Sequence, residues 1–214
     1  MVDERFWDAE NVWYQEAPVS RLAKALAQYD VYRSIVHLPG EIAEFGTFKG
    51  ASLVRLATYR EVLESAHARV IYGFDVFADM PAGEGAGDAD VAQRFGNQGE
   101  CLSLAETEEL MRGKGFENVE LVAGDILETL PRFLAERPAL RLALVNVDVL
   151  LKPVTAEVIR LCAERLVPGG VLMLDDYGKA AGATEAAEEF LAASPGYELR
   201  RAPTSYQPAL LVRL

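Results

Sequence analysis

Cysteine and histidine are scarce in this chain: each occurs twice among 214 residues. Cys101 and Cys162 lie far apart and show no metal-type spacing. The sequence therefore predicts neither a disulfide framework nor a cysteine-bound zinc ion, and we interpret both as free thiols in a reducing cytoplasm. His37 precedes a helix stop and His67 lies in a predicted turn. We expect both histidines at the surface and assign neither of them a chemical role.

Positive charge is also in short supply, because 21 Lys and Arg stand against 33 Asp and Glu, for a formal net charge of −12. Nonspecific binding to nucleic acid or to anionic membranes requires basic patches, so we expect neither partner. No apolar run approaches the roughly 18 residues of a membrane span. The first residues lack the basic and apolar regions of a signal peptide. We expect a cytoplasmic protein whose partner is a small molecule.

Strand-like apolar runs alternate with helical segments along most of the chain. Such alternation produces a parallel sheet with helices on both faces. The sequence therefore predicts one α/β domain over residues 1–214, a Rossmann-like, doubly wound, seven-stranded sheet, mostly parallel with an antiparallel C-terminal strand. An N-terminal arm and helical segment over residues 1–39 precede it. The expected strands are residues 41–46, 70–74, 119–122, 140–147, 171–174, 197–200 and 209–213.

Helices are expected at residues 18–36, 51–65, 103–112, 126–135 and 184–193, and Pro153 opens another. Ser103 and Glu106 have the spacing of a capping box. In the first of these helices the residues near a helical period are Leu22, Leu26, Tyr29, Val31, Tyr32, Ile35 and Val36.

Residues 40–56 read as a short buried strand, a glycine turn and the start of a helix. Glu44 lies at the end of the strand, and Gly46 can take a backbone conformation that lets a ligand approach the main chain. Such a turn after the first strand of an open α/β sheet binds nucleotide-like ligands. Because Phe48 and Ala51 interrupt the G-x-G-x-x-G fingerprint and no P-loop is present, a dehydrogenase and tight pyrophosphate binding are disfavoured. The turn suits a cationic ligand without phosphates, such as S-adenosylmethionine (SAM).

Two segments outside the predicted core have open interpretations. Residues 76–104 are rich in glycine and acid, and loops this long are usually functional lids or disordered. We expect a lid with a short helix at residues 91–95, the alternative being a merely mobile loop. The aromatic arm at residues 1–17 either folds over a site, or packs on a partner subunit and so forms a homo-oligomer, or is a frayed terminus.

Acidic residues end successive predicted strands, and the carboxyl ends of parallel strands share one rim. Glu44, Asp75 and Asp125 suit the amine, ribose and adenine donors of a cofactor. Carboxylates held together repel unless they share a proton or a cation, and Mg²⁺ and Ca²⁺ prefer oxygen ligands. Such a cation would lower the pKa of a substrate hydroxyl, and Asp148 would take its proton. The second cluster on this rim comprises Asn146, Asp148, Asp175 and Asp176.

These segments together resemble the class I SAM-dependent methyltransferases, and within them the macrocin O-methyltransferase (TylF-like) family, which methylates sugar hydroxyls. The similarity runs from about residue 21 to residue 190. GFD-x-F followed by PGG-x-x-x-x-DDYG is more specific than G-x-F-x-G alone. The matching segments are LPGEIAEFGTFKGASL (38–53), YGFDVF (72–77), GDILETLP (124–131), LVPGGVLMLDDYG (166–178) and GATEAAEEF (182–190).

The resemblance implies a bound SAM and a Mg²⁺ ion. It implies a metal site at Asn146, Asp175 and Asp176, with Asp148 as the catalytic base. The cofactor contacts expected on this basis are Glu44, Gly46, Thr47, Phe48, Ser52, Asp75, Gly124, Asp125 and Ile126.

The chain departs from the family pattern at the end of the fourth strand. Family members usually read D-x-D-x-Y-E-x-T there, whereas residues 146–153 read NVDVLLKP. Asn146 replaces the first acid and can bind a metal only through its carbonyl oxygen, and Asp148 could move in as ligand instead. Lys152 could reach the carboxylates and partly replace a cation.

The leading hypothesis is an O-methyltransferase that acts on a sugar or a sugar-containing small molecule. One alternative is a catechol-type O-methyltransferase, which uses a similar Asp-Asp-Asn metal set. Another is a catalytically inactive SAM-binding protein, for which Asn146 and the missing Tyr-Glu pair are the arguments.

Overall fold

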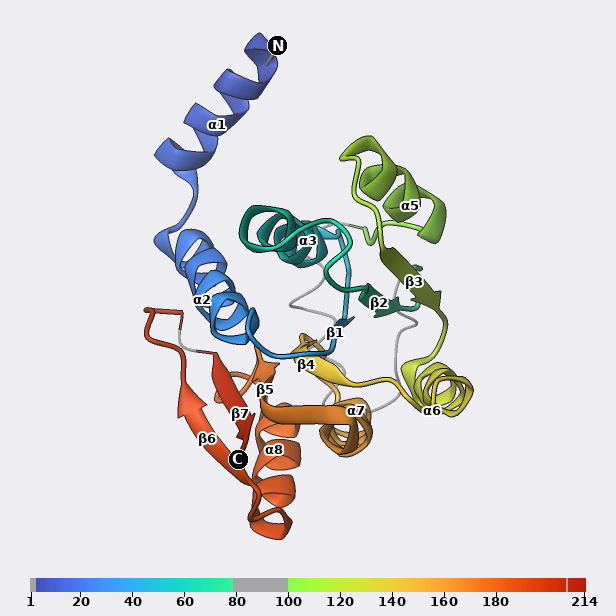
Figure 1. Ribbon diagram of the computed structural model, residues 1–214. Coiled ribbons are helices and arrows are strands. Elements are labelled where there is room, and N and C mark those ends of the chain that lie inside the picture. Colours follow the sequence, from blue (N-terminus) through green and yellow to red (C-terminus); the bar gives the residue numbers. More distant parts are fainter. Residues whose placement is uncertain (1–2, 79–99, 207) are drawn as a thin grey trace.

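A computed structural model of the chain describes residues 3–78, 100–206 and 208–214. Seven strands of the described chain form one sheet in the order β3-β2-β1-β4-β5-β7-β6 (Figure 1). The first five strands are parallel, and β7 runs antiparallel to both β5 and β6. The predicted sheet is confirmed. Its strands are β1 (Glu41–Phe45), β2 (Ile71–Asp75), β3 (Val119–Ala123), β4 (Leu142–Val147), β5 (Leu166–Leu174), β6 (Tyr197–Arg201) and β7 (Ala209–Arg213).

Helices cover both faces of the sheet. The helices α2, α3 and α5 contribute to one apolar core, and α6, α7 and α8 to the other (Figure 1). None of the helices in the described ranges is long and apolar enough to cross a membrane. Their bounds are α1 (Glu4–Glu16), α2 (Val19–Ile35), α3 (Ala51–Leu63), α5 (Leu104–Gly113), α6 (Ile126–Glu136), α7 (Lys152–Arg165) and α8 (Ala181–Ala193).

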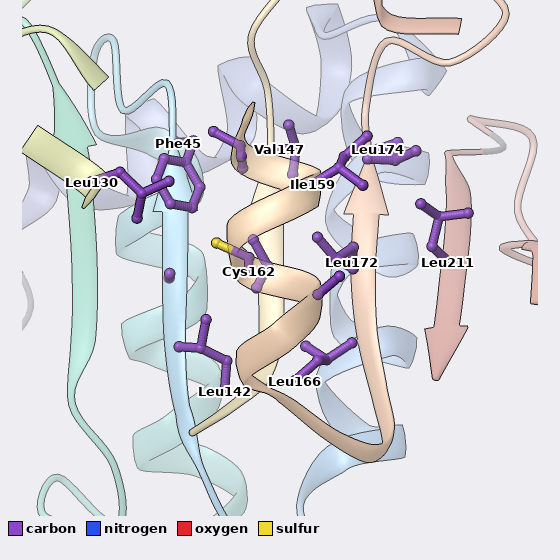
Figure 2. Packing of buried hydrophobic residues seen from close by; sticks show 14 of the residues in the cluster. Phe45, Leu130, Leu142, Val147, Ile159, Cys162, Leu166, Leu172, Leu174 and Leu211 are labelled. Atoms are coloured by element: carbon purple, nitrogen blue, oxygen red, sulfur yellow. The ribbon is translucent and has the colours of Figure 1, made fainter. Parts of the chain in front are cut away.

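The central strand β4 is buried along its whole length, as its apolar sequence predicts for a strand covered on both faces. Figure 2 shows α7 against this part of the sheet, with Ile159 and Cys162 among side chains of β1, β4 and β5. Burial raises the pKa of the Cys162 thiol, so this cysteine is a small core residue without reactivity. The capping box of Ser103 and Glu106 is present at the start of α5.

The fifth strand begins earlier than predicted. The fifth strand was expected at residues 171–174, but β5 already starts at Leu166 and includes Pro168, Gly169 and Gly170. Leu166 pairs with Leu142, and the register then shifts so that Leu144 pairs with Val171. The Pro-Gly-Gly segment is therefore an irregularity within the strand, because residues on both sides of it pair with β4.

The N-terminal arm is helical. Asp3 caps α1 and accepts a hydrogen bond from the backbone N–H of Arg5. No residue of α1 is buried, and the helix extends away from the sheet (Figure 1). In this structure the arm therefore does not close over a site formed by the described residues. Most of the predicted lid, including its expected helix at residues 91–95, lies outside the described residues.

The predicted helix α2 is present, and Val31, Tyr32 and Ile35 are buried as expected, but the first half of the helix buries a different face from the expected one. Leu22 and Leu26 are 39% and 49% exposed. The side chains that face the protein instead include Lys24 and Gln28, which share a stripe at helical spacing with small and apolar residues. The buried residues of α2 are Ala23, Lys24, Ala27, Gln28, Val31, Tyr32 and Ile35. This orientation brings a lysine to the sheet.

Candidate active site

Several predicted site residues lie on the face of the sheet that α2 and α3 cover. Glu44 of β1 pairs in register with Asn146 of β4, and Asn146 pairs with Met173 of β5. Neighbours in register share a face, and so do residues two positions apart along a strand. Asp148 and Asp175 continue that face just beyond the ends of β4 and β5. The predicted rim of polar side chains therefore forms where these strands end.

Three carboxylates gather at this rim. One carboxylate oxygen from each of Asp148, Asp175 and Asp176 lies within 4.8 Å of those of the other two. Asp175 and Asp176 are buried. The second acidic cluster predicted from the sequence is thus confirmed for its three aspartates.

Lys24 lies inside this acidic cluster. Its Nζ donates hydrogen bonds to Asp148 Oδ2 at 2.8 Å and to Asp175 Oδ2 at 3.0 Å. The hydroxyl of Tyr206 donates to the same oxygen of Asp175 at 2.6 Å. Burial alone would lower the pKa of Lys24, but Asp148 and Asp175 outweigh it and raise that pKa. Lys24 therefore remains an ammonium ion at this position.

A different lysine, Lys152, was expected to place its positive charge beside these carboxylates. Lys152 was predicted to reach the carboxylates, but its Nζ lies 3.0 Å from Glu185 and 2.8 Å from Glu189. It forms these pairs at the surface because α7 directs its first residue toward α8, away from the acidic cluster. The Lys152 prediction is wrong, and sequence reasoning missed both Lys24 and Tyr206.

Two carboxyl groups of the acidic cluster, those of Asp148 and Asp176, have raised pKa values and so resist ionisation. Burial raises the pKa of Asp148, Asp175 raises it further, and Lys24 opposes both effects. Burial raises the pKa of Asp176 to about 7, with Asp148 and Asp175 adding to the effect. Carboxylates with such raised pKa values are suited to accepting a proton during a reaction near neutral pH.

Glu44 stands beside the acidic cluster and is completely buried. Its Oε1 accepts a hydrogen bond of 2.8 Å from Asn146 Nδ2. Burial raises the pKa of Glu44 to about 7, which Ser52 and Asn146 partly offset. Glu44 Oε2 and Thr47 Oγ1 have no partner among the described residues. Because a buried acceptor without a donor is costly, these atoms fit a ligand that brings donors, as the ammonium group of SAM does.

Asp75 orders the turn that follows β1. Its Oδ2 accepts a hydrogen bond from the backbone N–H of Phe48 at 2.7 Å, and its Oδ1 accepts one from Phe77 at 3.2 Å. Phe48 takes a positive φ of 50°, so the carboxylate supports a backbone conformation that is uncommon for this residue. Asp75, which is predicted to bind the ribose of the cofactor, therefore also stabilises the turn that follows β1.

The turn after β3 brings the remaining predicted cofactor residues beside β2. The backbone N–H of Gly124 donates to the main-chain oxygen of Asp75 at 3.0 Å. Asp125 caps α6 by accepting from the N–H of Leu127 at 2.8 Å. Ile126 is buried directly after it. The first and third loops of the rim are thus both tied to Asp75.

Gly46 is needed for packing of the main chain. Its φ is +89°, and a Cβ at this position would come within 2.1 Å of the main-chain oxygen of Asp148. The unusual backbone conformation predicted for Gly46 is present, and the space that a side chain would fill is taken by Asp148 and Val149, which follow β4. The turn at residues 46–50, which is predicted to bind the cofactor and is called the cofactor turn below, therefore contacts the main chain of Asp148, the predicted base.

The oxygens present would suit a cation. Asn146 Oδ1, Asp175 Oδ1 and Asp176 Oδ2 are buried without a hydrogen-bond partner among the described residues. These three residues are the predicted metal ligands, and Mg²⁺ binds oxygen atoms of this kind. The other oxygen of Asp175 already binds the Lys24 ammonium. A divalent ion at these residues would therefore share Asp175 with a second positive charge.

Comparison with known proteins places this site in a family. The family model for macrocin O-methyltransferase (TylF) matches residues 20–195. Among solved structures, the calicheamicin methyltransferase CalS11 is 27% identical with a TM-score of 0.77, and the match covers 94% of this chain and 83% of that chain. CalS11 is a TDP-rhamnose 3'-O-methyltransferase. A search of the curated proteins found no match.

Two further structures share the fold. The O-methyltransferase NovP is 21% identical with a TM-score of 0.76, over 89% of this chain and 79% of that chain. TomG from Streptomyces achromogenes, solved in complex with SAM, is 16% identical with a TM-score of 0.56, over 100% of this chain and 91% of that chain. Because the family model spans most of the domain, including every predicted site residue, this chain belongs to the macrocin O-methyltransferase (TylF) family and is a SAM-dependent O-methyltransferase.

Proposed function

We propose that this enzyme transfers the methyl group of SAM to a hydroxyl of a sugar or sugar-containing small molecule. The observation that carries the proposal is the contact between Gly46 and the main chain of Asp148. It sets the cofactor turn and the catalytic base side by side at the carboxyl ends of β1 and β4. The sugar acceptor is supported by the family and by CalS11, which methylates a rhamnose nucleotide.

The cofactor residues have distinct tasks in this proposal. Glu44 and Thr47 present unpartnered buried oxygens to the amino group of the cofactor. Asp75 offers its remaining acceptor capacity to the ribose hydroxyls while it holds the turn. The other residues proposed to line the cofactor are Gly46, Phe48, Ser52, Gly124, Asp125 and Ile126.

Asp148 is the proposed base. The acceptor oxygen bonds to the methyl carbon, the bond from that carbon to sulfur breaks, and the hydroxyl proton passes to Asp148. S-adenosylhomocysteine is left as the product. The transfer itself requires no metal ion; a divalent cation held by Asn146, Asp175 and Asp176, if one bound, would lower the pKa of the acceptor hydroxyl. Positioning of the two reactants at adjoining strand ends supplies the rest of the rate enhancement.

The proposal is tested with SAM and a panel of nucleotide sugars, glycosides and catechols, with methylated products detected by mass spectrometry. We expect methylation of a sugar hydroxyl and a decrease in kcat of at least about 100-fold in Asp148→Asn. Lys152→Met, outside the acidic cluster, serves as the control with unchanged turnover. Methylation of catechols alone would favour the catechol-type alternative. SAM binding without turnover on any acceptor would favour an inactive SAM-binding protein.

A further inference from the structure

An ammonium group occupies the acidic cluster in which the sequence predicts a divalent cation. Lys24 Nζ binds Asp148 and Asp175 at 2.8 Å and 3.0 Å. The lysine side chain is only 9% exposed. It comes from the buried stripe of α2, between Ala23 and Ala27. Because α2 packs on the sheet, the fold itself holds this charge in place.

The sequence also departs from the family pattern in a way that weakens the binding of a divalent cation. An asparagine at position 146 removes one negative charge from the metal position that the family pattern predicts. Lys24 adds a positive charge to the carboxylates that remain. Both features reduce the attraction of the acidic cluster for a divalent ion.

Lys24 and a divalent ion would also compete for one side chain. The ion would take the unpartnered Oδ1 of Asp175, while Lys24 holds Oδ2 of the same carboxylate. Mg²⁺ requires oxygens at about 2.0–2.1 Å, so the ion and the ammonium would be close neighbours. Salt screens charges in a buried site only weakly, so their repulsion would persist.

We propose that Lys24 is the resident cation of the acidic cluster. It offsets part of the negative charge of Asp148 and Asp175, orients Asp148 as the base, and weakens divalent-cation binding so that methyl transfer proceeds without a metal. The inference rests on the proposed methyl transfer, and in it Lys24 is a positioning residue that acts through Asp148.

The first test measures Mn²⁺ binding, with the free ion detected by electron paramagnetic resonance. The wild-type enzyme is expected to bind Mn²⁺ at least about tenfold more weakly than Lys24→Met, in which the carboxylates lose their ammonium. Lys24→Arg should bind as weakly as the wild type, because it keeps the charge. Lys152→Met is the matched control, since it removes a lysine that binds two carboxylates elsewhere, and should also match the wild type. Equal Mn²⁺ affinity in the wild type and Lys24→Met would overturn the inference.

The second test is the metal dependence of the wild-type enzyme, which needs no variant to fold. Full turnover in EDTA is expected, with no increase on adding Mg²⁺. Loss of turnover in EDTA and its return with Mg²⁺ would show that Lys24 does not replace the ion. The Mn²⁺ comparison requires no acceptor. It therefore decides the role of Lys24 even if no acceptor is methylated. SAM binding without methylation of any acceptor would count against the proposed function and not against the role of Lys24.

Discussion

Gly46 packs so closely against Asp148 that a Cβ on the glycine would lie 2.1 Å from the main-chain oxygen of the aspartate. Gly46→Ala must therefore move either the cofactor turn or the end of β4. The substitution also places alanine at a φ of +89°. We expect it to lower the free energy of unfolding by more than about 2 kcal/mol, measured by urea denaturation, and to weaken SAM binding, measured by calorimetry.

Gly115→Ala separates the steric clash from the backbone strain. Gly115 has a φ of +71°, and nothing lies within 4 Å of a Cβ placed on it. Its substitution should cost only the left-handed conformation of alanine, about 1 kcal/mol. If both variants lose the same stability, the contact between Gly46 and Asp148 is not the cause.

Glu44 makes the stability of the free enzyme depend on pH. Burial raises its pKa from 4.5 to about 7. The folded state therefore binds more protons than the unfolded state between these values, and stability falls as the pH rises through this range. Glu44→Gln removes this titration and keeps an oxygen that can accept from Asn146. We expect the variant to exceed the wild type in stability by up to about 3 kcal/mol above pH 7, and to match it near pH 4.

The measurement is urea denaturation of both proteins across this pH range. A difference that does not vary with pH would contradict the raised pKa. SAM binding gives an independent result, because Glu44→Gln removes the charge that we assign to the cofactor's amino group. Affinity should fall although stability rises, and unchanged affinity would remove Glu44 from the cofactor site.

The acidic rim was predictable because it depends on local sequence. Each of the five parallel strands has an acid at or just beyond its end, and parallel strands bring their carboxyl ends together. That logic predicted the three aspartates of the acidic cluster. It did not predict that Asn146 donates to Glu44, since register between β1 and β4 is a long-range property.

The position of Lys24 at the acidic cluster could not be predicted from local sequence. It precedes Asp148 by 124 positions, and its role depends on how α2 turns about its axis over the sheet. The helical period of the apolar residues predicted a face that includes Leu22 and Leu26, which the structure leaves exposed. The available signal was the small pair Ala23 and Ala27, which permits close packing beside Lys24. Tyr206 lies in the connection between β6 and β7, where the sequence has no periodic pattern.

The N-terminal helix offers a test of the homo-oligomer, one of the three alternatives that the sequence leaves open for residues 1–17. Because α1 buries no residue, deleting residues 1–17 should leave the free energy of unfolding of a monomer unchanged within about 0.5 kcal/mol. The exposed aromatics of α1 are Phe6, Trp7, Trp13 and Tyr14. Sedimentation and thermal melting at several protein concentrations provide the measurement. A marked loss of stability together with a smaller sedimenting species would show instead that α1 packs on a second copy.

Asn146→Asp restores the acid of the family pattern, and its effect follows from the neighbouring Glu44. The native amide donates to Glu44 Oε1 at 2.8 Å, and both side chains are fully buried. The substitution replaces this donor with a second carboxylate, and two buried carboxylates at hydrogen-bond distance must share one proton.

Relative to the wild type, Asn146→Asp should therefore lose about 1–3 kcal/mol of stability above neutral pH and less in mild acid, where both groups can be protonated. Thermal melting above neutral pH and in mild acid, each with and without Mg²⁺, provides the measurement. Because Lys24 still contributes its positive charge, Mg²⁺ should raise the Tm of Asn146→Asp only slightly and that of Asn146→Asp combined with Lys24→Met strongly. An equally strong rise in both would mean that the asparagine alone, and not the lysine, keeps a divalent ion from this site.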